Sequence, residues 1–208
     1  GARCGTSRGI AHLGVIQVLR EEGIPIDIVP GCSMGAVVGA LYVIGSDIYF
    51  LEKYSQSFNT VKFFGFAVHT GGMMKGKKIQ QLIRLLTKNR KFEDTEIPFA
   101  CSAIDIMNSK VDVFKSGPIH HAVRASISIP GIFAPYDYNG TTYIDGSVLD
   151  RVPVQAARDL GTEIVAVDMA FRSVRVKIET LKTTLELCDW HNANRIPQDV
   201  DVLIVPQI

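Results

Sequence analysis

Residues 28–46 of the chain read IVPGCSMGAVVGALYVIGS, the longest stretch of the sequence without Asp, Glu, Lys or Arg. Its 19 residues match the length of a membrane-spanning helix. Pro30 and several glycines, however, disfavour one continuous helix. The alternative is a short buried strand, a tight turn and a buried helix of small residues, which would lack charges because a sheet and other helices cover it. We favour this second interpretation, which makes the stretch the centre of a globular fold.

Within this stretch, Gly31-Cys32-Ser33-Met34-Gly35 forms a G-x-S-x-G motif between an apolar strand and a small-residue helix. The motif is typical of a nucleophile elbow, a sharp turn that projects a serine hydroxyl from the end of a sheet. Glycines at positions 31 and 35 leave room on either side of Ser33. The free N–H groups of the following helix, beginning at Met34, would point at the same place. A helix-capping serine among packing glycines is the structural alternative.

Outward from the motif, apolar periodicity predicts strands that alternate with helices. We expect helices from residue 10 to Gly23 and over 36–44, 47–57, 76–89, 120–128, 153–160 and 177–194. We expect strands over 25–29, 99–104, 110–115, 141–144, 163–168 and 200–205, and an aromatic, glycine-containing loop over 61–74. This alternation indicates an α/β fold with helices on both faces of a mostly parallel sheet. The 208 residues predict a single domain over 1–208.

Composition narrows the class of protein and its partners. Hydrophobic residues make up 47% of the chain and charged residues 21%, which indicates a globular protein rather than a disordered one. The net charge of +1 gives no reason to expect nucleic acid as a partner, and docking onto a membrane would be weak and apolar. We expect a cytoplasmic protein, peripheral to the membrane at most, because residues 1–8 lack the apolar core of a signal peptide. The oligomeric state is left open.

The cysteines point to the same compartment and to no metal. Cys4, Cys32, Cys101 and Cys188 include no C-x-x-C pair, which disfavours a zinc ribbon or a thioredoxin-type motif. Four cysteines in 208 residues do not make a disulfide scaffold. We therefore expect reduced thiols, no metal and no other cofactor.

A nucleophilic serine needs a base, and the sequence offers histidines and carboxylates. The serine–acid–histidine order of α/β-hydrolases leaves only one of the five histidines, His191, which lies in a polar segment predicted to be helical. Asp145 follows the predicted strand 141–144 and precedes Gly146. Partial burial there would raise the pKa of Asp145 and make it a better base. Three other aspartates are competitors on sequence alone: Asp105, Asp137 and Asp168.

The segment Gly5-Thr6-Ser7-Arg8-Gly9 is a second turn that leads into a helix. Its backbone N–H groups would converge on an anion. Phosphate binding is one interpretation, although the segment matches neither G-x-G-x-x-G nor G-x-x-x-x-G-K-[ST]. An oxyanion hole beside the serine is another, and a flexible turn is the third.

In combination, these motifs resemble the patatin-like phospholipase family, particularly its small bacterial esterases related to neuropathy target esterase. Residues 7–15 (SRGIAHLGV) resemble the oxyanion block of that family, and residues 31–35 resemble its nucleophile elbow. Residues 124–135 (RASISIPGIFAP) look like the segment before its second catalytic residue, and Asp145-Gly146 matches its D-G-[GA] block. The four matches follow the family's order over nearly the whole chain.

The resemblance implies a three-layer α/β/α patatin-like fold and a catalytic dyad of Ser33 and Asp145, with no catalytic histidine. Ser33 would attack the carbonyl of a lipid ester, and Asp145 would take its proton and later activate water. Backbone N–H groups of residues 5–9 and of Met34 would bind the oxyanion, with Arg8 in electrostatic support. The implied activity is that of a serine acyl-ester hydrolase of the phospholipase A or lysophospholipase type.

The chain also departs from the family pattern. Cys4 and Thr6 stand at two glycine positions of the oxyanion block, and Ser147 replaces the second glycine of D-G-G. The family's first strand, expected before this block, is missing from the sequence. Two alternatives therefore stay open: a non-catalytic module that binds lipid or a partner, and an acyltransferase that uses the same serine. Residues 61–74 and 127–133 are candidate apolar walls for an acyl chain, unless they pack in the core.

Overall fold

A computed structural model of the chain describes residues 11–47, 49, 77–130, 133–150, 152–158, 165–167 and 202–204. The described helices are α1 (Ala11–Glu21), α2 (Met34–Val43), α5 (Lys77–Leu86), α6 (Ile119–Ser126) and α7 (Val154–Arg158), with the 3₁₀ turns η2 (Phe92–Asp94) and η3 (Gly146–Val148). The strands are β1 (Val29–Cys32), β2 (Phe99–Asp105), β3 (Lys110–Phe114), β4 (Tyr136–Tyr138), β5 (Thr141–Asp145), β6 (Val165–Val167) and β7 (Val202–Ile204). The predicted loop 61–74 and helix 177–194 lie outside the described residues, as does the helix predicted over 47–57 apart from Asp47 and Tyr49.

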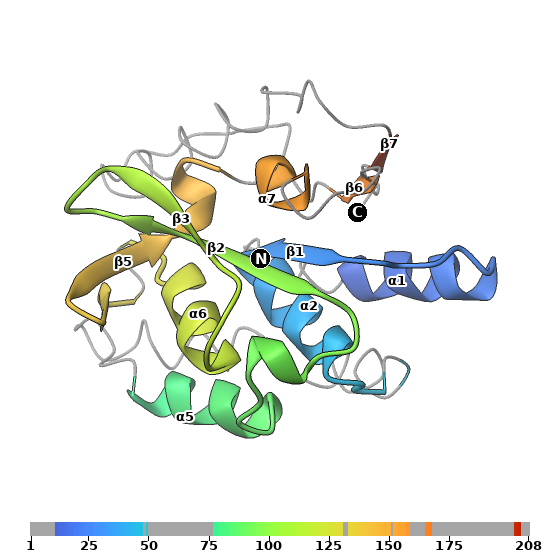
Figure 1. Cartoon of the computed structure of the whole chain (residues 1–208), viewed down its shortest axis with the longest axis horizontal. Coiled ribbons are helices and arrows are strands. Elements are labelled where there is room, and N and C mark those ends of the chain that lie inside the picture. Colours follow the sequence, from blue (N-terminus) through green and yellow to red (C-terminus); the bar gives the residue numbers. More distant parts are fainter. Residues whose placement is uncertain are drawn as a thin grey trace, which may run out of the picture.

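A five-stranded sheet lies between two layers of helices (Figure 1). Helices α2 and α6 pack on one face of the sheet, and α5 packs against α6. Helix α7 lies on the other face, over β1 and β2. The α/β class and the three-layer arrangement expected from the sequence are confirmed.

The central sheet mixes parallel and antiparallel pairs. β1 pairs with β2 in parallel, and so do β6 and β7 in a separate two-stranded sheet. β3 and β5 pair with β2, and β4 with β5, in the antiparallel sense. Short connections explain two of these antiparallel pairs, because four residues join β2 to β3 and the two-residue turn Asn139-Gly140 joins β4 to β5. Both turn residues have positive φ, 51° and 81°, which suits a two-residue hairpin. Among the described strands, the parallel pairing expected for most of the sheet is found in β1–β2 and β6–β7.

β1 and β5 share one edge of β2, one after the other. β1 pairs with residues 99–102 of β2 and β5 with residues 103–105, while β3 occupies the opposite edge. β1 runs in the direction of β2 and β5 runs against it. The carboxyl ends of β1 and β5 therefore meet, with Cys32 opposite Ser102 and Asp145 opposite Ala103. The residue that follows β1 is brought beside the last residue of β5.

β1 lies later in the chain than predicted. The sequence placed a strand over 25–29, whereas β1 spans Val29–Cys32 and pairs with Phe99–Ser102. Gly31 and Cys32, expected in a turn, are strand residues because they pair with Cys101 and Ser102. Helix α2 begins at Met34, two residues before the predicted start. The chain consequently reverses from strand to helix at one residue, Ser33.

The charge-free stretch 28–46 contains β1, Ser33 and α2 rather than one long helix. Helix α2 has ten residues and is about 15 Å long, half the thickness of a bilayer core. Within the part of the chain that the structure describes, no helix has both the length and the apolar character needed to cross a membrane.

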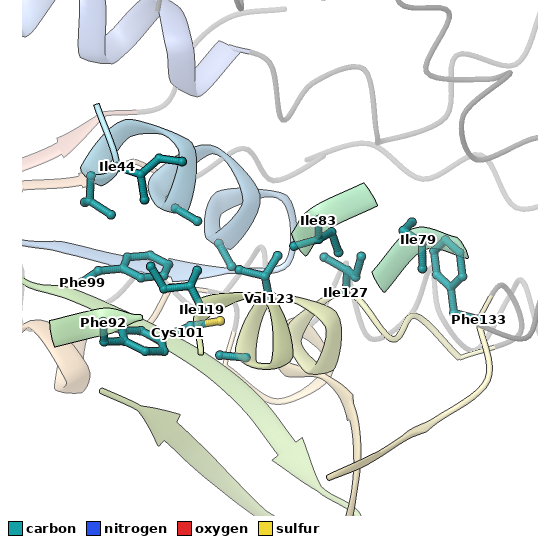
Figure 2. Packing of buried hydrophobic residues seen from close by; sticks show 14 residues of the cluster. Ile44, Ile79, Ile83, Phe92, Phe99, Cys101, Ile119, Val123, Ile127 and Phe133 are labelled. Atoms are coloured by element: carbon teal, nitrogen blue, oxygen red, sulfur yellow. The ribbon is translucent and has the colours of Figure 1, made fainter. Parts of the chain in front are cut away.

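The main hydrophobic core lies between the sheet and the layer formed by α2, α5 and α6 (Figure 2). Phe92 and Phe99 stack there with ring centroids 5.2 Å apart. Small residues bring α2 close to the strands, since Ala36 and Ala40 are fully buried. Gly39 makes the closest approach: a Cβ at this position would stand 2.9 Å from Val29 Cγ1 and 3.1 Å from Phe99 Cε2.

Two glycine-to-alanine substitutions test this packing. Gly39→Ala should lower the free energy of unfolding by about 1–3 kcal/mol, because the added methyl group overpacks the contact between α2 and the sheet. Gly14→Ala is the matched control in α1, where an added Cβ meets no described atom within 4 Å. It should raise stability by about 0.5–1 kcal/mol through helix propensity. Urea unfolding of both variants measures the difference, and equal effects of the two substitutions would contradict the packing described.

Candidate active site

Ser33 occupies a strained position between β1 and α2. Its φ of 54° and ψ of −121° lie where non-glycine residues are rare. A Cβ on Gly31 would lie 2.6 Å from Ala36 Cα and 2.7 Å from the Gly35 carbonyl oxygen, so glycine is needed there. A Cβ on Gly35 would meet only His12 Nε2, at 3.8 Å, which is an ordinary contact. This turn therefore requires glycine at position 31, whereas the described residues leave room for a side chain at position 35.

The Ser33 hydroxyl donates a hydrogen bond to Asp145 Oδ2, with an oxygen–oxygen distance of 2.6 Å. Asp145 ends β5, and 1% of its surface is exposed. Its second oxygen, Oδ1, accepts the N–H of Ser147 at 2.8 Å, which fixes the plane of the carboxylate. Gly146 allows this approach, because a Cβ there would lie 2.8 Å from both Cys32 Sγ and the Ser102 carbonyl oxygen. The structure thus brings together the serine and the aspartate that the sequence singled out.

The Cys32 thiol stands beside this pair but is a poor nucleophile. Cys32 is buried at the end of β1. Burial and the negative charge of Asp145 raise the pKa of the thiol well above its usual value. Because only the thiolate reacts readily, Cys32 does not compete with Ser33.

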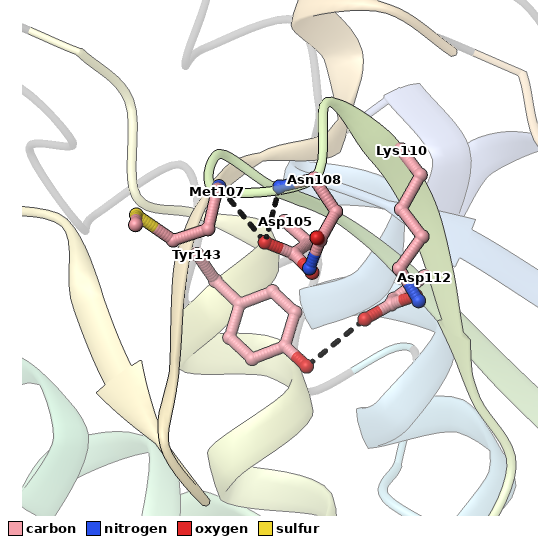
Figure 3. A network of polar contacts seen from close by, with 6 residues as sticks. All are labelled: Asp105, Met107, Asn108, Lys110, Asp112 and Tyr143. Atoms are coloured by element: carbon pink, nitrogen blue, oxygen red, sulfur yellow. Dashed lines mark hydrogen bonds and ion pairs between the residues drawn. The ribbon is translucent and has the colours of Figure 1, made fainter.

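Two other candidate carboxylates serve structural roles. Asp105 Oδ1 accepts the N–H groups of Met107 and Asn108, and Oδ2 accepts the Asn108 side-chain amide at 2.6 Å (Figure 3). These hydrogen bonds, led by that of the amide, lower the pKa of Asp105 and make it a weak base. Asp137 lies in β4 and accepts the Thr142 hydroxyl at 2.6 Å. Asp168, the third competitor, lies outside the described residues.

Three of the five histidines are described, and two of them lie at the far end of α6 from Ser33. His120 and His121 begin α6, and His121 contacts the Tyr136 hydroxyl through Nδ1. Burial lowers the pKa of His120 to about 4, so its ring is neutral at pH 7. His12 belongs to α1 and lies near Gly35, as noted above. His69 and His191 fall outside the described residues.

The predicted oxyanion hole is described only in part. Gly5, Thr6, Ser7, Arg8 and Gly9 lie outside the described residues, and α1 begins at Ala11, two residues after this segment. On the other side, Met34 and Gly35 are the first residues of α2, and their N–H groups have no acceptor within the helix. The helix dipole adds positive potential at this end. Within the described ranges, no group of three or more His, Cys, Asp and Glu side chains is arranged to bind a metal ion.

A further carboxylate, that of Asp150, lies close to Ser33 and Asp145. Its N–H donates to the Gly146 carbonyl oxygen at 2.9 Å, and its charge adds to the raised pKa of Cys32. Burial raises the pKa of Asp150 to about 6. No signal in the sequence marked Asp150, because its burial depends on contacts that form only in the folded chain.

Comparison with known proteins shows the family to which the chain belongs. The family model of the patatin-like phospholipases matches residues 3–158. An uncharacterized NTE family protein of Mycobacterium tuberculosis is 35% identical over 152 residues, which cover 72% of this chain and 42% of the relative. Lysophospholipase NTE1 of Candida albicans is 33% identical over 172 residues, covering 79% of this chain and 12% of the relative. The chain belongs to the patatin-like phospholipase family.

Structural comparison supports the fold. The crystal structure of VipD from Legionella pneumophila superposes with a TM-score of 0.62 at 13% sequence identity, over 86% of this chain and 50% of VipD. This likeness shows a shared fold. The chain spans less than half the length of each of these two curated relatives.

The raised pKa of Asp150 predicts a pH-dependent stability difference. The folded-state pKa of about 6 exceeds the ordinary value of 3.8, so ionisation is penalised in the folded state. The stability this provides is full below pH 4 and is lost as the pH rises through 6. Asp150→Asn should therefore match the wild type at pH 4 and be more stable by about 1–2 kcal/mol at pH 7, after allowance for solvent screening. Urea unfolding at both pH values measures this, and a pH-independent difference would contradict it.

Proposed function

We propose that this chain is the catalytic domain of a lipid acyl-ester hydrolase of the phospholipase A or lysophospholipase type. The observation that carries the proposal is the 2.6 Å hydrogen bond from Ser33 Oγ to Asp145 Oδ2. A general base must lie within hydrogen-bond reach of the proton that it removes, and this pair meets that requirement. Membership of the patatin-like phospholipase family supports the same reaction.

In the first half of the proposed reaction, Ser33 Oγ attacks the ester carbonyl carbon while its proton passes to Asp145. The carbonyl oxygen becomes an oxyanion, which the N–H groups of Met34 and Gly35 and those of residues 5–9 would stabilise. Collapse of this intermediate breaks the bond to the alcohol. The leaving alcohol takes the proton from Asp145, and the acyl group stays on Ser33.

In the second half, Asp145 takes a proton from a water molecule, which attacks the acyl carbon of Ser33. The ester bond to Ser33 breaks, the proton returns to Ser33 Oγ, and the free acid leaves. One aspartate thus serves as base and then acid in both halves of the cycle. Its burial and its contact with the Ser147 N–H hold it in one orientation throughout.

The lipid substrate is proposed from the relatives. The Candida albicans relative carries the name lysophospholipase, which favours a phospholipid or lysophospholipid ester here. A substrate of this kind comes from a membrane or a micelle. With a net charge of +1, contact of the chain with such a surface would be weak and apolar rather than electrostatic.

Substitution of the pair tests the mechanism. Ser33→Ala should lower kcat/KM for p-nitrophenyl butyrate and for a lysophospholipid by about 10³-fold or more, because the nucleophile is gone. Asp145→Asn keeps the shape of the side chain but removes the base, and should cost about 10²–10⁴-fold. Asp137→Asn in β4 is the matched control and should keep wild-type rates. Thermal midpoints of all three variants check that the fold is retained.

Two results would overturn the proposal. Near wild-type rates in both Ser33→Ala and Asp145→Asn would show that other residues carry the reaction. If the wild-type protein, with an alcohol acceptor present, forms neither free fatty acid nor a new ester of that alcohol, the non-catalytic binding module is favoured instead.

A further inference from the structure

The carboxyl end of α6 contacts the main chain of both proposed catalytic residues. Ser126 is the last residue of α6, and its hydroxyl oxygen accepts the N–H of Ser33 at 2.8 Å. Two residues later, the carbonyl oxygen of Ser128 accepts the N–H of Asp145 at 3.1 Å. Both serines are fully buried. One helix end therefore contacts the nucleophile and its base, which lie 112 residues apart in the sequence.

The turn that follows α6 is itself fixed by a buried arginine. Arg124 has 1% of its surface exposed, and its Nη1 donates to the Ser128 hydroxyl at 2.6 Å. The Ser128 hydroxyl donates back to the Arg124 carbonyl oxygen at 2.9 Å, and Nη2 donates to the Ala134 carbonyl oxygen at 3.1 Å. The guanidinium also lies over the Tyr136 ring, 5.2 Å from its centroid. These contacts fix Ser128 and the turn that follows Ser126.

The hydroxyl of Ser126 supplies a hydrogen-bond acceptor for the N–H of Ser33 at the elbow. The pairing of β1 with β2 ends at Ser102, and Ala103 pairs with β5, so the N–H of Ser33 needs an acceptor other than a regular strand partner. The Ser126 hydroxyl is that acceptor. A hydrogen bond to the nucleophile's own N–H also removes this group from the set that could bind an oxyanion. The N–H groups of Met34 and Gly35 stay available on the helix side.

We propose that Ser126 is a positioning residue for Ser33. Its hydroxyl holds the strained backbone of the nucleophile, so that Ser33 Oγ keeps its hydrogen bond to Asp145. By occupying the N–H of Ser33, it also leaves the oxyanion to the N–H groups at the start of α2. Ser126 does not touch the substrate. The proposal rests on the proposed function only in that Ser33 is taken as the nucleophile, and its effect is on nucleophile activation, whatever ester is cleaved. A purely structural role for a buried serine would instead change stability without changing the reactivity of Ser33.

A matched control is available in β2. Ser102 is 1% exposed and lies next to β1, and its hydroxyl lies beside the Cys32 thiol rather than on the N–H of Ser33. Ser126→Ala and Ser102→Ala thus delete the same atom from equally buried sites, and only the first removes a contact with Ser33. Ser126→Cys, kept reduced, provides a second variant that fills the space with a weak acceptor.

The experiment measures the second-order rate of labelling by a fluorophosphonate, located by mass spectrometry. In this reaction the bond from Ser33 Oγ to phosphorus forms, the bond from phosphorus to fluorine breaks, fluoride leaves and Asp145 takes the proton. We expect Ser126→Ala and Ser126→Cys to label roughly 10-fold more slowly, the cost of one buried hydrogen bond. For p-nitrophenyl butyrate, kcat should fall by a similar factor with KM within about twofold. Ser102→Ala should match the wild type in each measurement.

The outcomes separate this proposal from the proposed function. Wild-type labelling rates in both Ser126 variants, or an equal loss in Ser102→Ala, would overturn the positioning role. If the wild type is labelled at Ser33 but releases no fatty acid from lipids, the proposed substrate fails while the labelling rates still decide the role of Ser126. No labelling of the wild type would overturn both, because Ser33 would then not be an activated nucleophile.

Discussion

The site depends on two strands that meet end to end along one edge of a third. β1 and β5 pair with consecutive halves of β2 from opposite directions, so their carboxyl ends face each other between Ser102 and Ala103. A serine that follows one strand and an aspartate that ends the other then lie within hydrogen-bond distance. Parallel pairing of β1 and antiparallel pairing of β5 are both required. The absent side chain at Gly146 lets the two ends close, because any Cβ there would overlap backbone of β2.

Bringing Ser33 and Asp145 together costs stability, because it strains one backbone position and buries polar groups. Ser33 is held at a backbone conformation that costs about 1–3 kcal/mol, and Asp145 is enclosed almost completely. A buried carboxylate is tolerated only when donors satisfy it, and the Ser33 hydroxyl and the Ser147 N–H are two such donors. The half-buried Asp150 adds a further carboxyl group whose ionisation is disfavoured at this end of the sheet. Backbone strain and buried polar groups of this kind are typical of functional sites.

The features of the site that were predicted from the sequence are those that depend on a few consecutive residues. The G-x-S-x-G motif indicated the elbow at Ser33, and a strand followed by Asp-Gly singled out Asp145, because both signals are contained in a few consecutive residues. The limits of β1 were wrong by three to four residues, since they depend on pairing with Phe99–Ser102, far along the chain. The short turn Asn139-Gly140 sets the antiparallel pairing of β4 with β5, a hairpin that was not predicted because β4 has only three residues. Ser126 lies in the segment 124–135 that resembles the family, but its partner is 93 positions away, so the segment alone does not show that its hydroxyl contacts Ser33.

The central claim is that Ser33 carries the acyl group during turnover, and trapping that group tests it most directly. The protein would be quenched in acid during steady-state turnover of p-nitrophenyl butyrate, and the peptide that contains residues 32 and 33 would be examined by mass spectrometry with fragmentation. The account predicts a butyryl group on Ser33 as an oxygen ester that disappears once substrate is exhausted. A butyryl group on Cys32, or turnover with no acyl group on this peptide in either the wild type or a slow Asp145→Asn variant, would contradict it.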